Sequence, residues 1–311
     1  EGGRAMREFD VSMSADAAVT AESCEGQRPS LLLHAAEVAP GGNRRRTAAR
    51  LVAACALLLL VVVCGDILRP QATSTDFAQK NLAPCLAHLF GTDWMGRDML
   101  ARTVAGLSTS VWVGLAASVC SGAIALVLAL VSALGGRAAD AVVGWLIDLV
   151  MGVPHMVLLI LVSYALGRGF WGVTLAVALT HWGSLARVLR AEAIQVRNQP
   201  FLRLAQAAGA SRVRIALAHV VPAILPQLIV GLVVAFPHAI LHEASITFLG
   251  FGLGADEPAI GVILSEAMQY LSMGYWWLAV LPGLALVAVV LVFDRLGSSL
   301  RDLVAPDSAQ A

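Results

Sequence analysis

The chain has 311 residues, of which 58% are apolar and 14% are charged, and its formal net charge is zero. This apolar content is far more than one soluble core of that size can bury, so it excludes an ordinary soluble domain. We therefore expect an all-α, polytopic membrane protein, in which the position of each charge along the chain matters more than the sum of the charges.

The first segment, residues 1–45, is rich in Ala, Ser, Glu and Gly and has no sustained apolar period. Such a composition predicts a disordered cytoplasmic tail. Because the chain starts at Glu1 and Met6 and Met13 follow closely, it stays open whether the residues before Met13 are native. The hydrophobic run that comes next has no small-x-small cleavage site after it, so it is expected to remain as an anchor.

Apolar runs long enough to cross a bilayer occupy most of the remaining chain. Three of them contain no Asp, Glu, Lys or Arg and exceed the ~20 residues of a spanning helix: Thr103 to Gly136, Ile215 to His242 and Ala267 to Phe293. Shorter or charge-interrupted runs complete a set of six predicted spans, at about 48–68, 105–134, 141–165, 169–187, 222–247 and 276–296. They define a transmembrane domain at 46–306, followed by a short tail at 307–311.

Arginine placement predicts the orientation. With the N-terminus inside, the inner segments hold thirteen basic residues: Arg44, Arg45, Arg46, Arg50, Arg137, Arg187, Arg190, Arg197, Arg203, Arg212, Arg214, Arg295 and Arg301. The outer segments hold five: Arg69, Lys80, Arg97, Arg102 and Arg168. Positive charge near span ends is retained in the cytoplasm, so we expect a multi-pass protein of the cell membrane with both termini cytoplasmic.

The outer segment between the first two spans, residues 68–103, is expected to form an ordered interfacial hairpin. Thr92 and Asp93 are candidates to cap a short helix, and Gly96 would allow a tight turn. Trp94 would anchor the segment at the membrane interface.

A basic amphipathic segment, FLRLAQAAGASRVRIALAHVVP at Phe201–Pro222, lies in the predicted cytoplasmic loop 188–221. A short helix that ends near Gly209, followed by a second helical piece, predicts an L-shaped docking element. Its candidate coupling residues are Arg203, Ala205, Ala208, Gly209, Ala210, Ser211, Arg212, Arg214 and Pro222.

We expect the apolar faces of this segment to fill a groove on a soluble partner, with the arginines on acidic rims. The predicted apolar contacts are Leu202, Ala205, Ala208, Val213 and Ile215. The alternative is that the arginines bind anionic membrane lipid.

Ionisable groups inside spans are costly and usually face a bundle interior or an aqueous cavity. This rule gives five candidates for the translocation path: Asp148, His155, His238, His242 and Glu243. A structural reading stays open, in which Asp148 pairs with an arginine and the histidines bond to helix carbonyls. Pro154 and Pro237 would permit helix bending within their spans.

Neither an active site nor a metal site is predicted. A P-loop needs a lysine after glycine, but the single lysine, Lys80, stands in QKN. His242 and Glu243 begin an HExxH pattern whose second histidine is replaced by Ile246. The five cysteines show no CxxC spacing. The chain is therefore not expected to be an enzyme or to bind a cofactor, a metal ion or nucleic acid.

Several segments, in the correct order, resemble the C-type permease subunit of dipeptide and oligopeptide ABC importers. They are GTDWMGRD at 91–98, SLARVLRAE at 184–192, AAGASRVRI from Ala207, EASITFLGFGLGADEPAIGVILSEA at 243–267 and LGSSLRDLVAP at 296–306. The loop departs from the family pattern Glu-Ala-Ala, since Arg203, Leu204 and Ala205 stand there, and His219 and Val221 replace the usual Ile and Leu.

The resemblance implies a type I ABC importer permease fold that forms half of a heterodimeric pore. Its implied partners are a homologous B-type permease subunit, ATPase subunits that bind ATP and Mg, an extracytoplasmic peptide-binding protein, short peptides and membrane lipids. The stretch Gly250–Pro258 cannot be a stable helix. We expect Gly250, Gly252, Gly254 and Pro258 to form an outer loop that receives the binding protein.

Two alternative functions remain open. Relatives with this scaffold would accept nickel, glutathione or haem instead of peptides. The alternative from a different class is that the chain is an autonomous secondary transporter or channel. The small number of spans and the long basic loop argue against this alternative.

Overall fold

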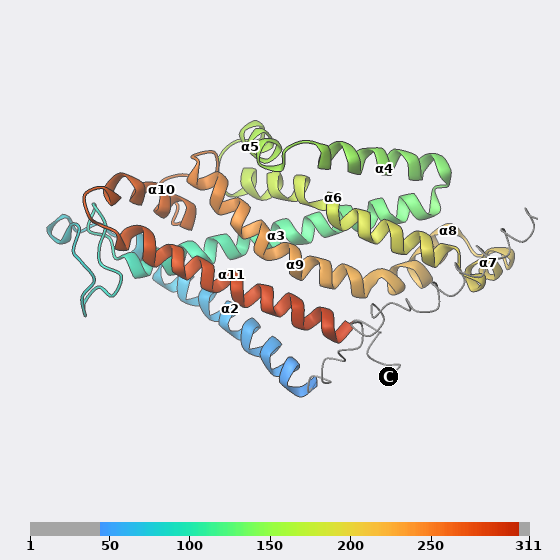
Figure 1. Ribbon diagram of the computed structural model, residues 1–311, viewed down its shortest axis with the longest axis horizontal. Helices are drawn as coiled ribbons and strands as arrows, with labels where there is room; N and C mark the ends of the chain where they lie inside the picture. Colours follow the sequence, from blue (N-terminus) through green and yellow to red (C-terminus); the bar gives the residue numbers. More distant parts are fainter. Residues whose placement is uncertain (1–43, 305–311) are drawn as a thin grey trace, which may run out of the picture. The chain divides into compact units, whose positions relative to one another are not determined.

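Helices account for most of the residues that the computed structural model describes, 44–304 (Figure 1). The predicted tails at 1–45 and 307–311 therefore lie almost entirely outside the described residues. In chain order the helices are α2 (Arg44–Thr73), η2 (Phe77–Gln79), α3 (Met99–Leu134), α4 (Arg137–Gly152), α5 (His155–Leu166), α6 (Phe170–Arg197), α7 (Pro200–Ala207), α8 (Arg212–Ile215), the π-helix η3 (Ala216–Val220), α9 (Val221–Phe248), α10 (Ile260–Leu271) and α11 (Trp277–Val304). The predicted all-α fold is confirmed.

Five helical stretches are long and apolar enough to cross a membrane: α2, α3, α6, the continuous run α8–α9 and α11. The predicted span at 141–165 is a bent pair, α4 and α5, whose axes differ by 96°. Pro154 disfavours helical geometry in the residue before it, and Val153 accordingly adopts extended backbone angles. The described unit therefore has six spans if the bent pair counts as one.

The apolar run Ala267–Phe293 is not one helix, although it contains no charged residue and exceeds the length of a spanning helix. α10 ends at Leu271, a turn with Gly274 at φ +93° follows, and α11 begins at Trp277. With 12 residues, α10 is too short to cross a bilayer. An unbroken run of apolar residues does not reveal such a turn.

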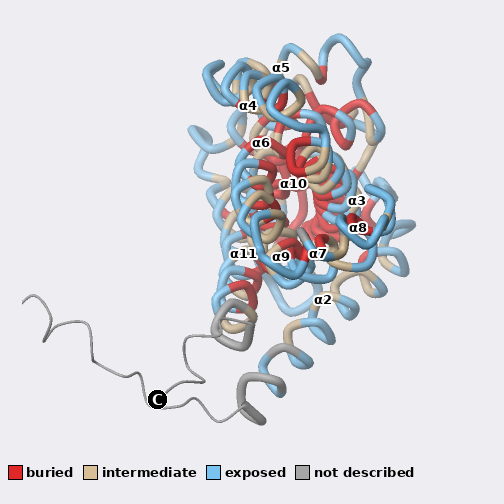
Figure 2. The backbone as a smooth tube through the Cα atoms, turned by 90° about the vertical axis from the view of Figure 1, so that its right-hand side faces the viewer, coloured by how far each residue is buried: buried red, intermediate tan, exposed pale blue. Residues whose placement is uncertain are grey.

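α3 lies at the centre of the bundle and packs against α2, α6 and α9. Its contact faces consist largely of small residues, and Ala117, Ala125 and Ala129 are fully buried. At Gly114 and Gly122 the absence of a side chain leaves room for aliphatic side chains of α9. Small residues of this kind let membrane helices approach closely. Figure 2 shows the buried positions where the helices meet and exposed positions around the outside.

At one end of the bundle, four charged side chains tie the segment before α3 and the first turn of α3 to α10. The carboxylate of Asp93 accepts hydrogen bonds from Arg97 and Arg102, each at 2.6 Å. Arg102 and Arg97 also reach Glu266 on α10, at 2.9 and 3.2 Å. Asp93 and Arg102 are almost completely buried, so this network replaces the water that they lose.

The predicted short helix after Thr92 and Asp93 is a turn instead, in which Asp93 accepts from the backbone N–H groups of Met95 and Arg97, each at 2.9 Å. Asp98 is the N-cap of α3 and accepts from the backbone N–H of Ala101 at 2.8 Å. Thr92 instead uses its hydroxyl within the loop, where it donates to the Gln79 carbonyl and accepts from the Leu82 N–H. The expected turn at Gly96 is present, with φ +77°.

The two ends of the bundle carry different segments (Figure 1). α10 and the residues before α3 lie at the left of the view, whereas α7 and α8 lie at the right. The start of α2 and the end of α11 lie toward the α7–α8 end. This arrangement agrees with the sequence-based expectation that residues 68–103 and the loop 188–221 lie at opposite ends of the spans.

Candidate functional site

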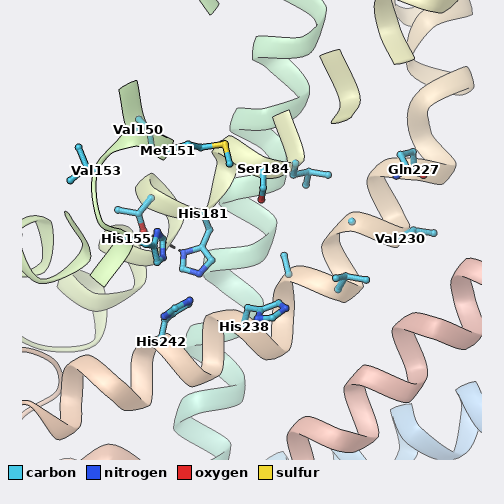
Figure 3. A pocket seen from close by; sticks show the side chains of 16 residues that line it. Val150, Met151, Val153, His155, His181, Ser184, Gln227, Val230, His238 and His242 are labelled. Atoms are coloured by element: carbon cyan, nitrogen blue, oxygen red, sulfur yellow. Dashed lines mark hydrogen bonds between the residues drawn. The ribbon is translucent and has the colours of Figure 1, made fainter. Parts of the chain in front are cut away.

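A cavity of about 490 Å³ lies between α6, α9 and the break that separates α4 from α5 (Figure 3). Its lining is apolar over much of its area but also includes polar side chains. They are His155, Thr180, His181, Ser184, Gln227, His238 and His242. A mostly apolar cavity with a few convergent polar groups is the usual form of a small-molecule site.

Three histidines from three different helices meet in this cavity. His155 is the first residue of α5, His181 lies in the middle of α6 and His242 lies on α9. The centroids of their imidazole rings are 4.5 to 4.8 Å apart. His238, one turn before His242, lies beside them (Figure 3).

Protein groups satisfy these rings only in part. His181 Nδ1 lies 3.1 Å from the carbonyl oxygen of Val177, and His242 Nδ1 lies 3.3 Å from the thioether of Met156. The Nε2 atoms of His155 and His181 are buried and have no hydrogen-bond partner within the described structure. Unpaired buried nitrogens carry a desolvation cost, so a ligand that bonded to them would remove that cost.

The structure brings together three of the five predicted path residues: His155, His238 and His242. Asp148 does not line the cavity; its exposed carboxylate pairs with Arg187 at 2.8 Å, which was the structural alternative. Glu243 also lies outside the lining. It is fully buried and accepts hydrogen bonds from Ser110 at 2.6 Å and Thr247 at 3.0 Å.

Sequence reasoning missed His181. It lies inside the predicted span 169–187, so the rule that selected the other histidines, an ionisable group within an apolar span, would have selected it too. What the sequence could not give is its position opposite His155 and His242, because three helices have to pack before those rings meet.

The predicted coupling segment forms the expected helix-turn-helix. α7 contains Arg203 and Ala205, Gly209 follows at φ +82°, and Ser211 caps α8 by accepting from the Arg214 N–H. Ala208, Gly209, Ser211, Arg212, Arg214 and Pro222 are exposed, and Ala205 and Ala210 are half-buried. The left-handed Gly209 conformation turns the chain between the two helices.

The predicted apolar docking face is partly wrong. Leu202 and Ile215 are buried in the core formed with α3, α4 and α6, so they anchor the segment to the bundle. The exposed apolar side chains are Phe201, Leu204, Val213 and Leu217. A short amphipathic segment does not show which of its faces meets its own bundle.

At the opposite end, residues 249–259 form the irregular loop that the alternating glycines predict. Gly250 has φ +85° and its carbonyl accepts a hydrogen bond from Arg168. Gly252 is buried against Thr247, and Pro258 is buried too, so only part of the loop is free for contacts. Ala255 and Asp256 form its exposed tip.

Comparisons with known proteins agree with this architecture. Residues 121–307 match the family described as binding-protein-dependent transport system inner membrane component. A protein of Brucella suis biovar 1, provisionally named a peptide transport system permease protein, is 34% identical over 238 residues, which cover 76% of this chain and 79% of the relative. The dipeptide transport system permease protein DppC of Bacillus subtilis is 28% identical over 245 residues, covering 78% of this chain and 77% of DppC.

A solved structure supports the fold. The crystal structure of an amino acid ABC transporter with histidines matches with a TM-score of 0.50 and 18% sequence identity, covering 64% of this chain and 92% of the other. At that identity the likeness concerns the fold alone. The family match and the permease relatives show that the chain belongs to the inner membrane components of binding-protein-dependent transport systems and is a permease subunit of an ABC transporter.

Proposed function

We propose that this chain forms half of the translocation pore of an ATP-driven importer of short peptides. One observation carries the proposal: α7 and α8 connect α6 and α9, two of the helices that line the histidine cavity. α6 is followed by α7 after only Asn198 and Gln199, and α8 continues through the π-helix into α9. A displacement of the helix-turn-helix is therefore applied directly to two walls of the cavity.

The surface of this segment fits a soluble partner domain. Phe201, Leu204, Val213 and Leu217 expose apolar area, and the exposed Arg212 and Arg214 lie on α8. Buried Leu202 and Ile215 hold the segment to the bundle, so it can transmit a force without unfolding. We assign this surface to an ATPase subunit, on which ATP and Mg are bound.

The remaining partners follow from the family and from the geometry of the opposite end. A homologous B-type permease would complete the pore, and a peptide-binding protein would dock at the exposed part of loop 249–259. Because the arginine-rich ends of the spans lie with α7 and α8, we place this end in the cytoplasm, together with both termini. The peptide cargo is supported by the names of the relatives.

Uptake of labelled di- to pentapeptides into vesicles tests this function, with the chain, its partner subunits and ATP present. The informative variant is Gly209→Val, because a β-branched residue does not tolerate φ +82° and the turn between α7 and α8 has to change. Gly136→Val is the matched control. Gly136 also has a positive φ, +88°, and open surroundings, but it lies between α3 and α4.

We expect ATP-dependent uptake to fall at least tenfold in Gly209→Val and to stay within about twofold of wild type in Gly136→Val. Equal losses in both variants would contradict the role of the helix-turn-helix. Uptake that continues without the ATPase would point to an autonomous carrier. If nickel, glutathione or haem were taken up with ATP in place of peptides, the assigned cargo would change, but the proposed coupling mechanism would stand.

A further inference from the structure

The histidine cluster has the composition of a transition-metal site. In His155, His181 and His242, one ring nitrogen of each lies within 4.8 Å of a ring nitrogen of the other two. Among the described residues that line the cavity there is no carboxylate. Glu243, next to His242 in the chain, accepts hydrogen bonds from Ser110 and Thr247 instead. Imidazole donors without carboxylates suit Zn²⁺, Ni²⁺, Co²⁺ and Cu²⁺, whereas Mg²⁺ and Ca²⁺ prefer oxygen ligands.

The hydrogen bonding of His181 leaves one of its ring nitrogens available for a ligand. The Val177 carbonyl can only accept, so Nδ1 of His181 carries the proton and donates it over 3.1 Å. Nε2 then has a free lone pair, and this atom is buried without a hydrogen-bond partner in the described structure. A backbone carbonyl that fixes the tautomer in this way is the usual outer partner of a metal-bound histidine.

Further groups around His181 offer donor atoms. His155 contributes a second buried nitrogen, Nε2, that has no partner among the described residues. The thioether of Met156 lies 3.3 Å from His242 Nδ1, and a thioether is a soft ligand. His238 lines the same cavity and is exposed to it.

The distances are within reach of coordination. Zn–N bonds of about 2.05 Å in a tetrahedron require nitrogen atoms about 3.3 Å apart. The observed nitrogens lie within 4.8 Å of one another, so the rings have to close by no more than about 1.5 Å. His155 can supply part of this movement, since it directly follows the break at Val153–Pro154.

We propose that His155, His181 and His242 bind one divalent transition-metal ion, with the fourth position open to the cavity. The ion enters either alone or as part of a metal–peptide complex that the transporter carries. Both sources present the same chemistry to the imidazoles. The site itself does not depend on the peptide cargo proposed above.

Zn²⁺ binding to the complete transporter in lipid nanodiscs tests the proposal, with a purification tag that contains no histidine. Equilibrium dialysis gives the bound Zn²⁺, and Cu²⁺ electron paramagnetic resonance reports the coordinated imidazole nitrogens. The variants are His155→Gln, His181→Gln, His242→Gln and the triple variant. His219→Gln is the matched control, since His219 lies in the π-helix outside the cavity.

We expect each single variant to weaken one Zn²⁺ site at least tenfold. The triple variant should lose that site, and His219→Gln should keep it. The Cu²⁺ spectrum of wild type should show imidazole nitrogens that the triple variant lacks. Wild type and a correctly assembled triple variant with equal Zn²⁺ binding would overturn the proposal. If the triple variant fails to assemble, the single variants and the wild-type Cu²⁺ spectrum decide. A wild-type spectrum without imidazole nitrogens would overturn the proposal, and so would single variants that bind Zn²⁺ as tightly as wild type.

Uptake of radiolabelled zinc into vesicles, with and without an unlabelled chelating peptide, separates the two sources. Zinc uptake that needs the peptide indicates a metal–peptide cargo, and uptake without it indicates the free ion. Peptide uptake in the presence of a strong metal chelator is measured in parallel. If no peptide is taken up under these conditions, the result would count against metal-free peptide as the cargo, while Zn²⁺ binding in nanodiscs would still establish the metal site.

Discussion

Individual ionisable side chains in this protein fall into two kinds of environment. Asp93, Arg97 and Arg102 are fully paired at one end of the bundle. His155 and His181 present buried nitrogens that no described protein group satisfies. Paired groups stabilise the packing, whereas unsatisfied groups in a cavity are available for a ligand.

Replacement of Asp93 by Asn should destabilise the protein strongly. Arg102 is almost completely buried and would lose its 2.6 Å ionic partner, although Glu266 remains at 2.9 Å. Removing one member of a buried ion pair costs about 3 kcal/mol. We expect thermal unfolding of the purified transporter to shift down by several degrees.

Asp148→Asn serves as the control for that variant, because the Asp148–Arg187 pair is exposed, with side-chain accessibilities of 74% and 52%. An exposed pair contributes about 0–1 kcal/mol. Similar shifts in the two variants would show that the network at Asp93 is not a structural tie.

The sequence was a good guide to the residues that carry polar or charged groups, and a poorer guide to the contacts that these groups make. The rule about charged groups in spans found His155, His238 and His242, but it also selected Asp148 and Glu243, which the structure places outside the cavity. Capping chemistry was recognised near α3, yet Asp98 performs it in place of Thr92 and Asp93. Such choices depend on contacts between segments far apart in the chain.

At the scale of helices, α10 depends on a very close approach to α9. A Cβ atom on Gly261 would lie 2.5 Å from the Ala244 carbonyl oxygen and 2.9 Å from the Phe248 nitrogen. Both neighbours are backbone atoms, so they cannot turn away as the end of a side chain can. The glycine therefore determines how closely the two helices pack.

Gly261→Ala should separate α10 from α9 and weaken the end of the bundle that carries loop 249–259. We expect a lower yield of assembled transporter and faster proteolysis at this loop. In Gly283→Ala the new methyl group would lie 4.0 Å from Leu264, an ordinary contact distance, and would meet no nearer described residue outside its own helix, so this α11 variant should behave as wild type. Normal assembly of Gly261→Ala would refute the close-packing explanation.

Hydrophobic length and loop composition predicted the helical elements well, because they are local properties. α7 and α8 could be placed from Gly209 and the amphipathic pattern. The burial of Leu202 and Ile215 could not be predicted in this way, since it depends on packing against α3, α4 and α6. The lack of charges in the run Ala267–Phe293 does not by itself reveal the turn at Gly274.

Across the whole molecule, Ser211 and Asp256 mark opposite ends of the spans. Both residues are exposed, one in the coupling segment and the other at the tip of loop 249–259. In a variant without its five native cysteines, Ser211→Cys should react with an impermeant thiol reagent only after the cells are opened. Asp256→Cys should react in intact cells. Labelling of both cysteines from the same side would contradict the proposed topology.

The 96° bend between α4 and α5 has a consequence for hydration. At this break, Met151, Gly152 and Val153 are exposed, and the helical hydrogen-bond ladder is interrupted. Hydrocarbon chains cannot bond to the freed peptide groups. We therefore expect faster deuterium exchange here than in the middle of α3, because this corner of the permease has to border on water or on another protein surface, and lipid cannot cover it.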